Sequence, residues 1–204
     1  MIKKIILILV LLAMLITTLA SQLAQAQEQA PESKDWLMEE LEPLNLRLNY
    51  YNFKTNLSIG SMSSDTSFNG IGVGANYDIK NFYVGADYAS FSNKSAFKWS
   101  NIRLIGGYQV KELNWIITPV VEVGYGIGSF EESGGSYKIS DSKGRVLSLD
   151  IGGLYKIKGL GYIIDHLSVY AGYGLMNQDH DSFDQVDSTT LKSQGFKLSI
   201  LYNF

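Results

Sequence analysis

Residues 68–79, FNGIGVGANYDI, alternate between apolar side chains and small or polar ones with a period of two. Successive side chains of an extended chain point to opposite sides, so such a segment has one apolar and one polar face. The polar face here carries glycine, asparagine and aspartate, and the apolar face carries Ile71, Val73, Ala75, Tyr77 and Ile79. The segment therefore predicts a β-strand that meets two different environments.

Seven further segments repeat this alternation, which gives eight predicted strands in all. Short connections are expected near 79–81, 111–114 and 158–165, and longer polar ones near 58–67, 92–97, 129–143 and 176–190. An even number of strands of about ten residues, with short turns at one end and long loops at the other, is typical of a transmembrane β-barrel. Pro119 lies inside the fifth segment, where it cannot donate a backbone hydrogen bond, and predicts a local bulge or break. The other predicted strands lie near 44–54, 81–91, 100–110, 115–128, 145–157, 166–175 and 195–204.

The alternative is a soluble barrel or sandwich that buries its apolar face. The other face of these strands carries glycine, serine, asparagine and several charges, and it would make a poor hydrophobic core if it pointed inward. A barrel with this polar face inside and the apolar face outside would not be stable in water. A lipid environment accepts the apolar face, and closure of the sheet satisfies every backbone group. The sequence favours an all-β, eight-stranded antiparallel barrel with an up-and-down meander and an apolar exterior.

The first 26 residues have the layout of a secretory signal peptide. Lys3 and Lys4 precede an apolar run over 5–19, and Ala24-Gln25-Ala26 provides a small-residue cleavage site. We expect signal peptide 1–26, a periplasmic leader over 27–43 and a barrel over 44–204. Removing Lys3 and Lys4 from the 17 basic residues leaves 15 against 20 acidic ones, so no nucleic-acid partner is expected. The absence of cysteine excludes disulfides and a lipid-modified cysteine.

The last strand, with Tyr202 two residues before a terminal Phe204, resembles the C-terminal signal of bacterial outer-membrane barrels. Together with the export signal and the eight strands, the chain resembles the OmpA/OmpX-like group of small outer-membrane barrels. The resemblance implies a monomer in the outer membrane of a Gram-negative cell, with outer-membrane lipid and lipopolysaccharide as neighbours. It also implies that the barrel assembly machinery recognises Phe196, Leu198, Ile200, Tyr202 and Phe204.

Five charged residues fall on the polar face at similar heights above the predicted turns. An eight-stranded barrel has room inside for little more than its own side chains, and buried charges need partners. We therefore expect an ion-pair network that plugs the lumen, with a gate in a narrow channel as the alternative. The members of this predicted network are Asp87, Arg103, Glu122, Asp150 and Lys197.

Candidate chemistry elsewhere is sparse. His166 and Ser168 resemble the histidine and serine of outer-membrane lipid A deacylases, but no glutamate follows to orient the histidine. The acidic segment 177–189 lacks the glycine and closing glutamate of a calcium-binding loop. We expect no catalytic residue, metal or cofactor, and a structural, surface-contact or envelope-maintenance role. A small-solute channel, a lipid-modifying barrel enzyme and an adhesin are the alternatives.

Overall fold

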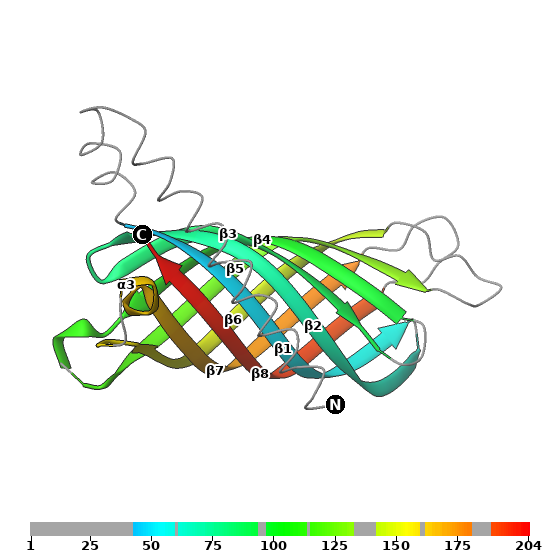
Figure 1. The fold of residues 1–204 in the computed structure, drawn as a ribbon. Helices are drawn as coiled ribbons and strands as arrows, with labels where there is room; N and C mark the ends of the chain where they lie inside the picture. Colours follow the sequence, from blue (N-terminus) through cyan, green and yellow to red (C-terminus); the bar gives the residue numbers. More distant parts are fainter. Residues whose placement is uncertain are drawn as a thin grey trace.

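The computed structural model describes residues 43–59, 61–93, 97–113, 115–132, 142–159, 162–180 and 189–204. The expected signal peptide, and the expected leader up to residue 42, lie outside these residues. Eight antiparallel strands follow one another in sequence order and close into a barrel, as the sequence predicts (Figure 1). The strands are β1 (Leu44–Ile59), β2 (Met62–Ile79), β3 (Phe82–Ser92), β4 (Phe97–Gln109), β5 (Ile117–Glu132), β6 (Ser142–Lys156), β7 (Leu167–His180) and β8 (Thr189–Asn203).

The barrel is closed by pairing of β8 with β1. When cross-strand partners are followed from Leu44 through every strand in turn, the path returns to β1 at Lys54, ten residues further along. This stagger in an eight-stranded barrel tilts the strands by roughly 40° from the barrel axis. A row of paired residues therefore climbs along the axis as it passes around the wall.

One end of the barrel, here called the turn end, carries short connections and the beginning of β1. Lys80 and Asn81 join β2 to β3, and Lys80 takes a positive φ of 58°. The 3-10 helix η1 (Lys111–Leu113) joins β4 to β5, and the four-residue helix α3 (Tyr162–Asp165) joins β6 to β7. Among the described residues, no helix is long and apolar enough to cross a membrane.

The opposite end, here called the loop end, differs from the prediction at its first connection. A long polar loop was expected near 58–67, but β1 continues to Ile59 and β2 begins at Met62. Polar side chains pair across the two strands instead: the Asn56 amide donates to Asp65 (2.7 Å), and the Ser63 hydroxyl donates to Asn56 (3.1 Å). The expectation of a loop was wrong because a strand that leaves an apolar environment can continue with polar side chains on its outer face.

The bulge predicted at Pro119 is also absent. Pro119 pairs with Gly153 of β6 in an unbroken register. On its other side the amide of Val110, just past the end of β4, donates to the Pro119 carbonyl (2.9 Å). The position of the missing proline N–H faces Val110, which lies just past the end of β4. The proline therefore removes a single hydrogen bond from the end of the β4–β5 pairing.

The outer wall carries a continuous apolar belt across its middle. On β6 the belt runs from Leu147 to Tyr155, eight residue steps that span about 20 Å along the axis at a rise of ~3.3 Å and a tilt of ~40°. This height is close to the ≈ 25 Å apolar band of transmembrane barrels. Side chains in the belt are strongly exposed, with Leu104 at 71 % and Phe196 at 69 %. We call this surface the apolar belt; its exposed members include Leu46, Ile71, Val73, Tyr77, Val84, Ile102, Leu104, Val123, Tyr125, Ile127, Leu147, Ile151, Leu175 and Phe196.

Candidate functional site: the filled lumen

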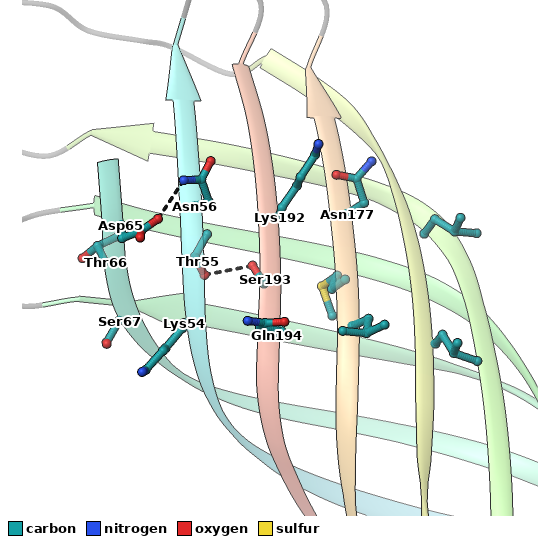
Figure 2. Close-up of a pocket in the computed structure, with 14 residues that line it drawn as sticks. Lys54, Thr55, Asn56, Asp65, Thr66, Ser67, Asn177, Lys192, Ser193 and Gln194 are labelled. Carbon is teal, nitrogen blue, oxygen red and sulfur yellow. Dashed lines mark hydrogen bonds between the residues drawn. The ribbon is translucent and has the colours of Figure 1, made fainter. Parts of the chain in front are cut away.

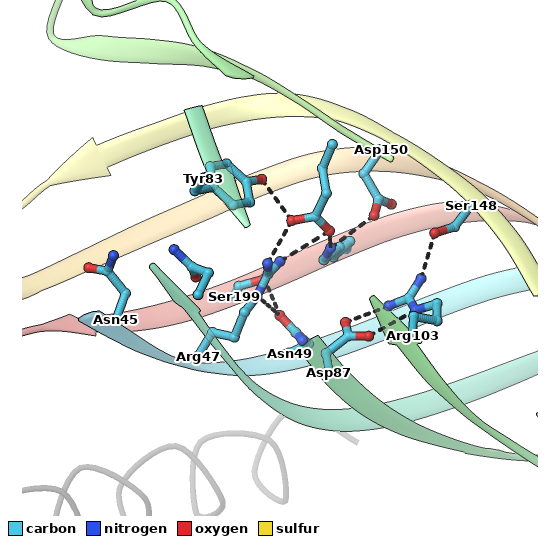
Figure 3. A network of polar contacts seen from close by, with 12 residues as sticks. Asn45, Arg47, Asn49, Tyr83, Asp87, Arg103, Ser148, Asp150 and Ser199 are labelled. Atoms are coloured by element: carbon cyan, nitrogen blue, oxygen red, sulfur yellow. Dashed lines mark hydrogen bonds and ion pairs between the residues drawn. The ribbon is translucent and has the colours of Figure 1, made fainter. Parts of the chain in front are cut away.

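The structure places all five charged residues of the predicted network inside the barrel and buries them. Figure 3 labels three of them, Asp87, Arg103 and Asp150, with some of their partners. Each of the five lies at an inward position because the strand alternation continues without interruption through β3, β4, β5, β6 and β8. Their exposed fractions are 3 % or less. Burial of this degree requires that every charge be matched within the lumen.

Asp87 and Arg103 form the first group, and they are direct cross-strand partners on β3 and β4. The guanidinium donates to both carboxylate oxygens of Asp87, Nε to Oδ1 at 2.9 Å and Nη2 to Oδ2 at 2.6 Å. Its remaining donors reach the hydroxyls of Ser148 (3.0 Å) and Tyr51 (2.9 Å). A two-pronged guanidinium–carboxylate pair of this kind fixes both partners in orientation as well as in charge.

Glu122 is the centre of the second group. It accepts from Arg47 Nη1 (2.6 Å), from the Lys197 ammonium (2.6 Å) and from the Tyr83 hydroxyl (2.7 Å). Lys197 also donates to Asp150 at 2.9 Å. Four strands, β1, β5, β6 and β8, are thereby linked across the lumen by a single set of ion pairs.

Arg47 is the member of the network that the sequence analysis did not assign. The five assigned residues comprise three carboxylates and two cations, which would leave one negative charge without a partner. Arg47 sits at an inward position of β1, is 6 % exposed, and completes three cations against three carboxylates. The unbalanced charge of the predicted set was the signal that could have found it.

Toward the loop end the lumen is filled with apolar side chains. Phe91 and Trp99 stack with their ring centroids 3.7 Å apart and nearly parallel, and Phe53 stacks on Phe91 at 5.8 Å. Gly70 leaves room for this stack, since a Cβ built on it would lie 2.4 Å from the Phe91 ring. We call these residues the upper cluster: Tyr51, Phe53, Leu57, Phe68, Ala89, Phe91, Trp99, Phe130, Val146, Met176 and Leu191. We expected a polar, plugged lumen; in this half of the barrel the lumen is filled mainly by apolar side chains, with buried polar ones such as Thr55 and Gln178 among them.

Toward the turn end a second apolar group lies below the charges. Tyr83 crosses to β4, where Gly107 accommodates it; a Cβ there would meet the Tyr83 ring at 2.1 Å. Tyr170 packs similarly over Gly172. We call this group the lower cluster: Tyr83, Ile105, Val120, Leu154, Tyr170 and Leu201. The charged layer is therefore enclosed between two layers of packed side chains.

The residues considered for catalysis and metal binding take part in other contacts. The His166 ring stacks on Tyr202 with centroids 5.9 Å apart, and the Asn203 amide donates to the Ser168 hydroxyl at 3.0 Å. These contacts tie β7 to β8 at the turn end. The described residues contain no group of three potential metal ligands. Most of the acidic segment considered for calcium, 181–188, lies outside the described residues.

A closed eight-stranded antiparallel meander, apolar outside and internally ion-paired, is the fold of the small outer-membrane β-barrels. The chain is similar to the crystal structure of Neisserial surface protein A (NspA), with a TM-score of 0.61, 14 % identity, and 79 % of this chain and 97 % of that chain covered. It also matches Ail of Yersinia pestis (TM-score 0.43, 10 % identity, 79 % and 99 % covered) and OprG of Pseudomonas aeruginosa (TM-score 0.44, 15 % identity, 80 % and 97 % covered). No protein-family model matches the sequence, and no curated protein matches it. At these identities the NspA likeness establishes the fold.

Proposed function

We propose that this chain is an outer-membrane barrel of a Gram-negative cell whose lumen is closed to solutes. In this proposal it is a structural or surface-contact component of the envelope, neither a channel nor an enzyme. The observation that carries the proposal is the filling of the lumen by three successive layers of packed side chains.

The apolar belt supports the membrane position. Its outward side chains are exposed leucine, isoleucine, valine and aromatic residues. Contact of these side chains with water is unfavourable, and lipid would cover them. Aromatic residues stand near its turn-end edge, where Trp115 is 64 % exposed and Tyr77 is 45 % exposed. Such residues favour the boundary between lipid and water. The turn end then faces the periplasm and the loop end faces the cell exterior, since short turns are periplasmic in barrels of this kind.

The layers of the lumen support closure. The upper cluster contains six aromatic rings that are at most 2 % exposed, the charged layer pairs three cations with three carboxylates, and the lower cluster contains two tyrosines. A conducting pore needs a continuous polar path with binding sites that ions can enter and leave. The charges here are engaged with one another at 2.6 to 2.9 Å and are covered from both sides.

Planar-bilayer recording of the purified mature protein tests the proposal. We expect no stepwise conductance above the baseline of the lipid alone. Insertion is verified in the same preparation by the change of electrophoretic mobility on heating that folded barrels show, and a porin inserted into the same lipid is the positive control. Steady, uniform conductance steps from folded protein would contradict a closed lumen and favour the narrow channel.

We also propose that β8 is the segment that the outer-membrane assembly machinery recognises. Phe196, Leu198, Ile200 and Tyr202 lie on the outward face of this strand, with Phe196 at 69 % and Leu198 at 37 % exposure, and Phe204 follows its last residue. The same strand pairs with β1 to close the barrel. A strand that presents an apolar outer face before closure can be held by another sheet edge until the seam forms.

A further inference from the structure

The outer wall of the barrel changes polarity along rows of cross-strand partners. One row passes from β6 through β7, β8 and β1 to β2, and its first two members are leucines. The following members are an amide, a lysine and a serine, and all five side chains are exposed. The members in order are Leu149, Leu175, Gln194, Lys54 and Ser67.

A second row lies next to the first, toward the loop end, and shows the same change. Its members in order are Leu147, Asn177, Lys192, Asn56 and Asp65. Because each row climbs along the barrel axis, it leaves the apolar belt between its last leucine and its first amide. The two rows together line a groove on the outer wall, which we call the boundary groove (Figure 2).

Lys54 and Lys192 both lie in the polar half of the boundary groove. In Figure 2 the Lys54 side chain is directed toward β2 and the Lys192 side chain toward the loop end, so the two side chains point apart. Lys54 pairs with Gln194, and Lys192 lies two residues before Gln194 in β8, so the lysines are diagonal neighbours. Diagonal neighbours lie about 7–8 Å apart, within reach of one shared small anion for long side chains. Behind them the buried hydroxyls of Thr55 and Ser193 are hydrogen-bonded at 2.9 Å and join β1 to β8 (Figure 2).

Neither lysine forms an ion pair with a carboxylate within the described part of the chain. The acidic residue of the groove, Asp65, accepts a hydrogen bond from the Asn56 amide at 2.7 Å. Two ammonium groups beside amide donors, immediately above exposed leucines, are complementary to a molecule with an anionic head and an aliphatic tail.

We propose that the boundary groove binds a phosphorylated glycolipid of the outer leaflet. Its phosphate lies between Lys54 and Lys192, and an acyl chain lies along Leu147, Leu149 and Leu175. This assignment rests on the membrane position proposed above, since only that position places the leucines in lipid and the lysines at the headgroups. Lysine binds phosphate as a point charge, and basic residues near an anionic lipid surface strengthen the attraction to it.

Lipid titration of the folded, detergent-solubilised mature protein tests the site, with native mass spectrometry as the readout. The probes are diphosphoryl lipid A and the same lipid with both phosphates removed. We expect the phosphorylated lipid to bind at least about tenfold more tightly to the natural protein, by the contribution of two lysines. K54Q/K192Q should lose that preference, and K98Q, which removes an exposed lysine from β4, should keep it. The preference should also fall as salt is added.

Equal binding of the two lipids to the natural protein would overturn the proposal, and so would an unchanged preference in K54Q/K192Q. Displacement of the lipid by inorganic phosphate at equal concentration would contradict the assignment to a lipid. Both substitutions lie on the exposed outer wall, so K54Q/K192Q should keep the heat-dependent mobility and the silent bilayer recording. A failure of the groove would therefore leave the closed barrel standing, and a failure of the closed barrel would be seen independently in the recordings.

Discussion

Asp87 and Arg103 show what each charge in the lumen contributes, because they form a pair with few other charged partners. Both side chains are fully buried and meet through two hydrogen bonds of 2.6 and 2.9 Å. Removing one partner leaves a buried charge without compensation, whereas replacing both by apolar residues removes the desolvation cost as well. The pair is therefore expected to be strongly non-additive.

D87N should lower the free energy of unfolding by about 3–5 kcal/mol, because Arg103 would remain charged in the lumen. The double variant D87L/R103M should be less destabilised than D87N alone. Urea unfolding in lipid vesicles measures both. D65N is the matched control, since Asp65 is exposed on the outer wall, and it should change stability by less than about 0.5 kcal/mol. Equal losses in D87N and D87L/R103M would mean that the charges are not energetically coupled.

The strands were predicted more reliably than the partners of their side chains. Alternation alone placed Asp87, Glu122 and Lys197 inside the barrel, because a strand assigns faces by counting residues. The contact between Arg47 and Glu122 joins residues 75 apart in sequence, on strands that meet only across the closed lumen. Which inward charge meets which depends on the stagger of the barrel, and no local pattern in β1 contains that information.

The ends of the strands were predicted less well than their middles. The sequence pattern predicts polar residues such as Ser58 and Asp65 in a loop, yet they form the upper parts of β1 and β2. Outside the apolar belt both faces of a strand can be polar or mixed, so alternation no longer distinguishes strand from loop. The bulge predicted at Pro119 is absent for a related reason. The number of hydrogen bonds that a proline removes depends on whether the neighbouring strand, here β4, still runs beside it.

The proposed recognition can be separated from stability at Phe204, which follows β8 and contributes little to the sheet. The Phe204 amide donates to the Leu44 carbonyl at 3.2 Å, and its ring meets Tyr202 with centroids 5.1 Å apart. F204A keeps the backbone bond, so unfolding in vesicles should change by less than about 1 kcal/mol. In cells, the amount of folded barrel in the outer membrane should fall several-fold, as measured by heat-dependent mobility. F82A removes an exposed aromatic ring from the same end of β3 and should not reduce assembly. Unimpaired assembly of F204A would contradict recognition through this residue.

Soluble domains place apolar side chains inside and polar ones outside, and this barrel reverses that distribution only in part. Its belt is apolar, as expected from alternation, but the loop half of its interior is also filled mainly by apolar side chains. The inward rings of Phe53, Phe68, Phe91, Trp99 and Phe130 lie in the loop-end halves of their strands, at positions that the alternation places inside. What the alternation could not predict is that five strands deliver these rings to one level, where they pack as a layer. The interior therefore stabilises the barrel by packing at both ends and by ion pairs in the middle.

The depth of the apolar belt makes the membrane position measurable. Leu104 lies near the middle of the belt and is 71 % exposed, so an arginine there would enter the centre of the bilayer. L104R should cost about 2–4 kcal/mol of folding free energy in lipid vesicles, and S92R, at the exposed loop end of β3, about 0–1 kcal/mol. The dependence on depth is the informative quantity, because a side chain surrounded by water would pay the same small cost at both positions. Equal stability of the two variants would show that the belt does not face lipid, and it would remove the basis for the boundary groove as well.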